Sequence, residues 1–140
     1  MSTEQNKALA AELIKALSIG DSDTMGRIIA EDCKWWVMGF PRDRTMTRQQ
    51  MIRGSKAIID KVLPGGFNLS VLGMTAEDDR VALEAEGRAY TVANKLYNNF
   101  YHFLFVFRDG QVIRGMEYTN PAHAIEVLGD IVKTLGKKQA

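Results

Sequence analysis

The sequence has little cysteine and little net charge. Its single cysteine, Cys33, excludes an internal disulfide and offers no spacing typical of a metal site. The formal net charge is +1, from 18 basic and 17 acidic side chains, and no basic stripe alternates with aromatic residues. Nucleic acid and anionic membrane surfaces are therefore poor candidate partners, and no metal is expected.

Long apolar runs are also missing. The first ten residues, MSTEQNKALA, lack the basic start and the apolar run of a signal peptide. No later segment is long and apolar enough to span a bilayer. We therefore expect a cytoplasmic protein with no membrane partner.

The residues that are present fit one globular domain. A chain of 140 residues, 46% hydrophobic and 25% charged, can bury a real core. It has no internal repeat, no low-complexity stretch and no interdomain linker. The prediction is one domain over residues 1–140, with a frayed tail at 136–140.

Hydrophobic spacing and turn residues predict the order of the elements. Helices are expected at 4–18, from Asp21, at 47–62 and from Asn120-Pro121 through Leu135. Strands are expected at 33–38, 67–76 and 80–91, followed by a long hairpin that turns at Asp109-Gly110. This order predicts an α+β fold in which a strongly curved antiparallel sheet wraps around a helix.

The first strand of that hairpin has two different faces, because side chains alternate across a strand. Its odd positions form a wall of aromatic rings with polar tips: Tyr97, Asn99, Tyr101, Phe103, Phe105 and Phe107. His102 lies among the even positions. By the same alternation Trp35 and Trp36 must point to opposite faces of their own strand.

The hairpin's turn decides which face carries Glu117, the acid of its second strand. A two-residue loop puts Glu117 on the face of His102, whereas a three-residue loop with a glycine bulge puts it beside Tyr101 and Asn99. The Asp-Gly pair suits both loops. We favour the bulge, because it sets the small Gly115 opposite an aromatic ring, Phe103, and leaves a hollow beside the acid.

Three motifs of the hairpin carry a family resemblance: Tyr97-x-Asn99-x-Tyr101-x-Phe103-x-Phe105, Asp109-Gly110-x-Val112 and Glu117-Tyr118-x-Asn120-Pro121. With the element order, they resemble the nuclear transport factor 2-like superfamily, in its SnoaL-like and ketosteroid-isomerase-like branch. The hairpin itself is most similar to the phenazine-biosynthesis A/B proteins. The resemblance implies a cone-shaped sheet (a cystatin-like α+β roll), a homodimer through the back of the sheet, and a pocket for a small apolar or cyclic molecule.

The chain departs from the families that it resembles at several functional positions. The stretch 36–38 lacks the base aspartate of the ketosteroid isomerases, and Leu13 stands near the place of their tyrosine. Ala85 and Gly87 stand where limonene-epoxide hydrolases carry an arginine and an aspartate. These departures argue against both known mechanisms. Glu117 is the one acid that matches the family pattern, so the resemblance points to it as general acid or base.

The predicted function follows from this acid and its surroundings. Burial among aromatic rings would disfavour the charged form of Glu117 and raise its pKa. We expect a cofactor-free enzyme of isomerase, cyclase or dehydratase type, with ligand contacts from Tyr97, Asn99, Tyr101, Phe103, Trp35, Met38 and Gly115. The competing prediction is a non-catalytic ligand-binding or dimerisation module.

Two simpler interpretations apply to the polar residues of the hairpin. Glu117 could end its strand in solvent, paired with Arg114 or Arg88. His102 is expected at an interface on the back of the sheet, although a different register would bring it near the acid.

Overall fold

The computed structural model describes residues 1–129 and confirms the α+β fold. The elements are α1 (Thr3–Ile19), α2 (Ser22–Ile28), β1 (Ile29–Val37), α3 (Arg48–Lys61), β2 (Leu69–Glu77), β3 (Arg80–Tyr90), β4 (Leu96–Arg108), β5 (Gln111–Thr119) and α4 (Pro121–Leu128). Their order agrees with the order predicted from the sequence. The continuation of the last helix to Leu135 and the tail 136–140 lie outside the described residues.

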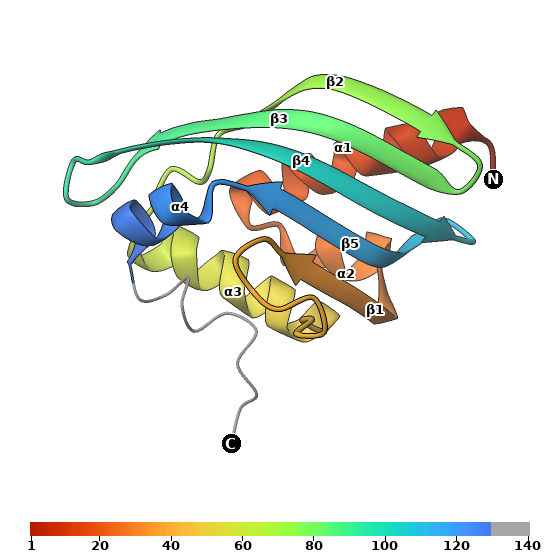
Figure 1. Cartoon of the computed structure of the whole chain (residues 1–140), viewed down its shortest axis with the longest axis horizontal. Helices are drawn as coiled ribbons and strands as arrows, with labels where there is room; N and C mark the ends of the chain where they lie inside the picture. The colour runs from red at the N-terminus through yellow and green to blue at the C-terminus, as the bar shows by residue number, and fades with distance from the viewer. Residues whose placement is uncertain (130–140) are drawn as a thin grey trace.

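The five strands form one sheet in the order β1-β5-β4-β3-β2 (Figure 1). Strands β2 to β5 pair antiparallel, whereas β1 pairs parallel with β5. The first strand begins at Ile29, earlier than the expected 33–38, because Ile29 pairs with Val112 of β5. The N-terminal third of the chain is thereby joined to the last strand.

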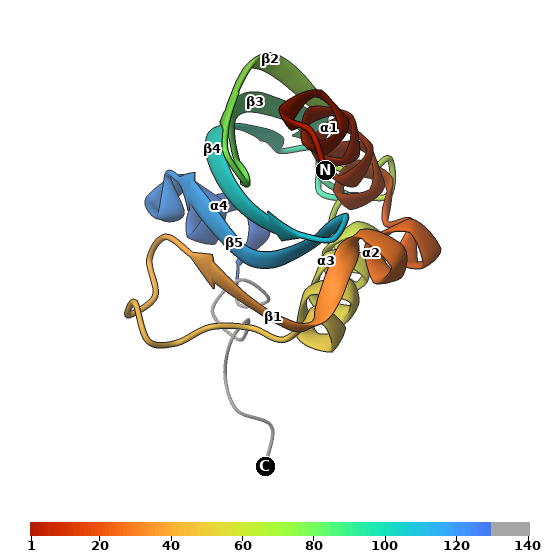
Figure 2. The same ribbon diagram turned by 90° about the vertical axis from the view of Figure 1, so that its right-hand side faces the viewer.

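The sheet is strongly curved, and the helices α1 and α3 lie on its concave side (Figure 2). The concave face of β4 carries the aromatic odd positions, which are buried, while the even positions are half-buried or exposed. The same alternation holds in β3, where Val81, Leu83 and Ala85 are buried. The core therefore fills the hollow of the sheet, and one end of that hollow becomes the pocket described below.

Polar caps start the helices at the expected places. The Thr47 hydroxyl accepts the backbone N–H of Gln50 while the Gln50 side chain accepts the N–H of Thr47, which is a complete capping box. Asn120 accepts two backbone N–H groups of α4, and Pro121 occupies the first turn. This second cap starts α4 directly after β5 in the chain, and α4 residues line the pocket described below.

The hairpin turn differs from the loop that we favoured. Asp109 and Gly110 form a two-residue loop with φ of 50° and 79°, and Arg108 pairs with Gln111. Both central residues thus have the positive φ that a type I′ hairpin turn requires. The expectation of a three-residue loop was therefore wrong.

A bulge inside β5 nevertheless turns Glu117 to the concave face. Phe107 pairs with Val112 and Val106 pairs with Arg114, so Ile113 is the extra residue. Beyond it Glu117 pairs with Phe103 on the aromatic face. The predicted face is correct, although the bulge lies four residues from the turn's start and not in the loop itself.

No helix among residues 1–129 is long and apolar enough to cross a membrane.

Candidate active site

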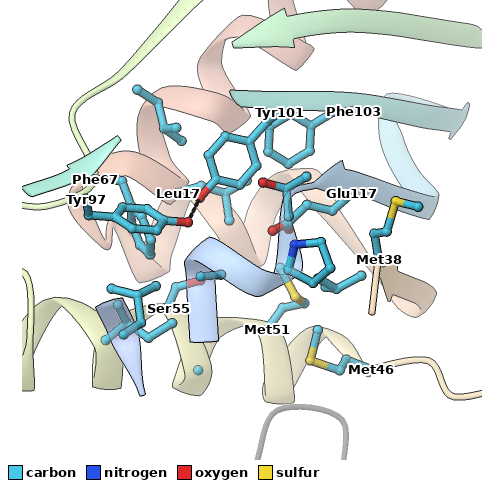
Figure 3. A pocket seen from close by; sticks show the side chains of 18 of the residues that line it. Leu17, Met38, Met46, Met51, Ser55, Phe67, Tyr97, Tyr101, Phe103 and Glu117 are labelled. Atoms are coloured by element: carbon cyan, nitrogen blue, oxygen red, sulfur yellow. Dashed lines mark hydrogen bonds between the residues drawn. The ribbon is translucent and has the colours of Figure 1, made fainter. Parts of the chain in front are cut away.

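A pocket opens between the concave face of the sheet and the helices that cover it (Figure 3). Its empty space, open mouth included, is about 780 Å³. The walls are largely apolar, with a few polar side chains among them. The lining residues are Leu17, Val37, Met38, Met46, Gln50, Met51, Gly54, Ser55, Ile58, Phe67, Leu69, Tyr97, Tyr101, Phe103, Glu117, Thr119, Pro121, Ala124 and Leu128.

Glu117 projects into this pocket from β5. The indole N–H of Trp35, on the neighbouring strand β1, donates to its Oε1 at 3.1 Å. The backbone N–H of Met38 donates to the Glu117 carbonyl at 2.8 Å and holds the end of β1 against β5. One carboxyl oxygen is therefore occupied by a hydrogen bond. The residue is only half-buried, and it lines the pocket.

The apolar surroundings change the acidity of this carboxyl group. Burial raises the pKa of Glu117 to about 7, and the hydrogen bond from Trp35 opposes that rise. Near neutral pH the group is therefore divided between its acid and its base form. Such a carboxyl group can both accept and release a proton under ordinary conditions.

Two tyrosine hydroxyls face the same pocket. Tyr97 and Tyr101 stand four residues apart on β4, so both point to the concave side, and their hydroxyls are hydrogen-bonded to each other (Figure 3). Burial is the main cause that raises the pKa of each phenol. Both tyrosines therefore remain neutral at physiological pH and can serve as hydrogen-bond donors.

Asn99 supports this pair from behind. It is buried, at 3% exposure, and its side-chain N–H donates to the Tyr97 hydroxyl at 3.0 Å. Its other contacts are to the backbone of Phe100 and Asn120. Asn99 lies outside the pocket lining, because these contacts turn its amide toward the start of α4.

The structure brings five of the eight expected site residues to the pocket wall: Glu117, Tyr97, Tyr101, Phe103 and Met38. Asn99, Trp35 and Gly115 lie outside the lining, and Trp35 reaches the site only through its bond to Glu117. A Cβ atom on Gly115 would lie 2.3 Å from Cε3 of Trp35. The hollow that we expected beside the acid is thus filled by the Trp35 indole, and Gly115 pairs with Phe105, not Phe103.

Helix α3 supplies a wall that the sequence reasoning missed. Its lining residues are Gln50, Met51, Gly54, Ser55 and Ile58, which share one face at helical spacing. That periodicity was visible in the sequence, but it marks a buried face and does not distinguish a pocket wall from ordinary core.

The two histidines lie away from the acid. His102 is exposed on the convex face and pairs with Glu84 of β3. His123 is half-buried: its ring stacks on Tyr97 with centroids 5.4 Å apart, and its Nε2 accepts the N–H of Asn98. Among the described residues, no group of three or more His, Cys, Asp or Glu side chains could hold a metal ion.

Comparison with known families gives one match, which covers most of the chain. Residues 10–115 match the model of the SnoaL-like domain. The match ends two residues before Glu117. No curated protein sequence matches the chain.

Solved structures with the same fold share little sequence with the chain. PrhC from Penicillium brasilianum has a TM-score of 0.80 at 14% identity, with 95% of this chain and 97% of PrhC covered. A LEH-like epoxide hydrolase of M. tuberculosis has a TM-score of 0.73 at 16% identity, with 95% and 96% covered. A protein from Jannaschia sp. CCS1, provisionally described as a SnoaL-like polyketide cyclase, has a TM-score of 0.74 at 14% identity, with 91% and 93% covered. These likenesses establish the fold.

Proposed function

The chain belongs to the SnoaL-like domain family, and from this premise we propose that it is an enzyme that moves a proton on a small, largely apolar molecule. The expected reaction is an isomerisation, a cyclisation or a dehydration that needs no cofactor. Glu117 is the proposed general acid and base. Tyr97 and Tyr101 are the proposed hydrogen-bond donors to the substrate.

One observation carries this proposal: a carboxyl group with a pKa of about 7 projects into an apolar pocket. A general acid–base group works best when its pKa lies near the working pH, because it then holds both forms in useful amounts. Strongly shifted acids in clefts are more frequent at functional sites than elsewhere, which makes Glu117 the best candidate of the described residues.

The proposed step is the enolisation of a carbonyl compound. The Glu117 carboxylate takes the proton from the carbon beside the carbonyl group, and the electron pair of that C–H bond moves onto the carbonyl oxygen. A tyrosine hydroxyl donates a hydrogen bond to the oxyanion that forms there. Return of the proton from Glu117 to another carbon completes an isomerisation. In a cyclisation, the enolate carbon instead bonds to a second carbonyl carbon, and Glu117 returns its proton to the alkoxide oxygen formed there.

The names of two structural neighbours are consistent with small-molecule chemistry on this fold, since one is an epoxide hydrolase and another is described as a polyketide cyclase. Fold likeness alone does not select between these reactions. The proposal therefore rests on Glu117 and its pocket.

Exchange of hydrogen for deuterium tests the proposal without knowledge of the natural substrate. The probe is 1-indanone in D₂O at pH 7, and the measurement is the loss of its α-proton signal by NMR. We expect the wild-type protein to accelerate exchange, and the Glu117→Gln variant to lose about 100-fold or more of that acceleration. Tight binding of 1-indanone with exchange at the buffer rate would contradict the catalytic proposal.

A second candidate function is ligand binding without turnover. It is favoured by the small number of ionisable groups: among residues 1–129, Glu117 is the only acid in the lining, and no histidine, lysine or arginine of that range lines the pocket. Tight binding of the probe without exchange would support this alternative.

We also propose a homodimer formed through the convex face of the sheet. Three large apolar side chains are exposed there on neighbouring strands: Tyr90 at 54%, Leu96 at 37% and Phe100 at 57%. Exposed apolar side chains gathered on one face favour a protein interface. A second copy of the chain would cover them.

A further inference from the structure

The orientation of the Asn99 amide is fixed by backbone groups on both sides. Its Oδ1 accepts the N–H of Phe100 at 3.0 Å, and its Nδ2 donates to the carbonyl of Asn120 at 3.1 Å. A backbone N–H can only donate and a carbonyl can only accept, so the amide cannot be turned around. The atom that lies 3.0 Å from the Tyr97 hydroxyl is therefore the nitrogen, and Asn99 donates to Tyr97.

This direction determines how many hydroxyl hydrogens remain for a ligand. Tyr97 and Tyr101 have two hydroxyl hydrogens between them, and their mutual bond uses one, whichever oxygen donates it. Asn99 takes neither hydrogen, because it is itself the donor. One hydrogen is left over, and both tyrosines line the pocket.

When the pocket is empty, the groups near the left-over hydrogen are weak hydrogen-bond acceptors. The Thr119 hydroxyl lies beside Tyr101 and already donates its own hydrogen to the carbonyl of Phe100 at 2.9 Å. It can therefore offer Tyr101 only the lone pair of a neutral hydroxyl. Glu117, when neutral, is a similarly weak partner. A ligand carbonyl or enolate oxygen would be the stronger acceptor.

We propose that Asn99 is a positioning residue: its fixed amide turns a donor, and not an acceptor, toward Tyr97, so the Tyr97–Tyr101 pair keeps one hydroxyl hydrogen to donate toward the pocket. The site then prefers ligands that present an acceptor oxygen, such as a ketone, over hydrocarbons of the same shape. The inference deepens the proposed function and rests on it for the claim that the pocket binds a small molecule. It concerns binding alone and does not require that the protein catalyses a reaction.

Replacement of Asn99 by aspartate tests the direction of the chain of hydrogen bonds. In Asn99→Asp an oxygen replaces the nitrogen, and that oxygen accepts the hydrogen of Tyr97. Tyr101 must then donate to Tyr97, and no hydroxyl hydrogen is left for the ligand. The matched control is Asn99→Ala, which removes the same contacts but supplies no acceptor, so the left-over hydrogen remains.

The measurement compares 1-indanone with indane, which lacks only the carbonyl oxygen, at pH 6, where Glu117 is mostly uncharged. We expect the wild type to bind the ketone about threefold to tenfold more tightly, and the carbonyl stretch of the bound ketone to move to lower frequency. Asn99→Ala should keep both effects, and Asn99→Asp should lose both. A merely structural role for Asn99 would affect both variants alike and would not change the carbonyl frequency.

Several outcomes would overturn the inference. One is an Asn99→Asp protein that retains the wild-type preference and carbonyl frequency. Should that variant not fold, the double variant Tyr97→Phe/Tyr101→Phe tests the donor itself, and an unchanged carbonyl frequency there would equally refute it. Binding of neither probe to the wild type would overturn the pocket proposal as well. Ketone preference without deuterium exchange would instead support the inference and refute only catalysis.

Discussion

Glu117 is held between two opposing influences at the scale of a single residue. The apolar walls of the pocket disfavour its charge, while the indole N–H of Trp35 favours it. The outcome, a pKa of about 7, affects stability as well as chemistry, because a proton held differently by the folded and unfolded chains links folding to pH.

The stability of the fold should decrease as the pH rises from the pKa of Glu117 in the unfolded chain to its pKa in the folded chain. The unfolded chain releases the Glu117 proton near 4.5 and the folded chain near 7, so the folded form binds more protons between those values. The free energy of unfolding should therefore decrease from about pH 4.5 to about pH 7, by up to about 3 kcal/mol. Urea unfolding of wild type and Glu117→Gln at pH 5 and pH 8 measures this.

The Gln variant is the control for all other titrating groups. We expect both proteins to be similarly stable at pH 5, and the variant to be more stable than the wild type at pH 8. Equal stabilities at pH 8 would mean that the charged form of Glu117 is not penalised in the fold.

The two adjacent tryptophans allow a matched test of the hydrogen bond that lowers the pKa of Glu117. Trp35→Phe removes the donor to Glu117, so the pKa of Glu117 should rise further above 7, as followed by NMR of the carboxyl carbon. Trp36→Phe removes an indole N–H that instead donates to the carbonyl of Phe40 at 2.9 Å, and should leave the Glu117 titration unchanged. A downward move in Trp35→Phe would contradict the assigned role.

At the scale of the element, β5 decides which face Glu117 occupies. The bulge at Ile113 adds one residue between Val112 and Arg114, and a shift of one residue moves every later side chain to the other face. The bulge therefore determines which of the later residues of β5 point into the pocket and which point to the convex face.

Single deletions in β5 test this assignment. Deletion of Ile113 removes the bulge but keeps Arg114 opposite Val106, so Glu117 should stay in the pocket with a raised pKa. Deletion of Met116, its matched control, should turn Glu117 to the convex face and return its pKa toward the ordinary value of 4.5. An equal pKa of Glu117 in both variants would show that the strand register does not control the acidity of this residue.

The elements of the fold were predictable because local signals mark them. Capping at Thr47 and Asn120, the alternation of β3 and β4, and the Asp109-Gly110 turn all act over a few residues. The site was predictable only in part. The inward direction of Glu117 depends on a bulge that no turn residue marks, and the gap at Gly115 is filled by Trp35, which is 80 positions earlier in the chain.

At the scale of the whole molecule, the convex face should determine the oligomeric state. We expect the wild type to sediment as a dimer at micromolar concentration, and Phe100→Lys to sediment as a monomer, because a buried unpaired charge is costly at an interface. The control is Val92→Lys, since Val92 is as exposed, at 67%, but lies between β3 and β4 outside both strands. A wild-type mass near one chain would refute the dimer.

The parallel pairing of β1 with β5 has a consequence for the synthesis of the protein. Ile29 pairs with Val112, and Trp35 reaches Glu117 across 82 positions of the sequence. Contacts so distant in sequence close late in folding, because a long loop must be closed before they form. On the ribosome the pocket cannot close until β5 has emerged. Until then Glu117 is an ordinary carboxylate in water, and its unusual acidity appears only once β5 has joined the sheet.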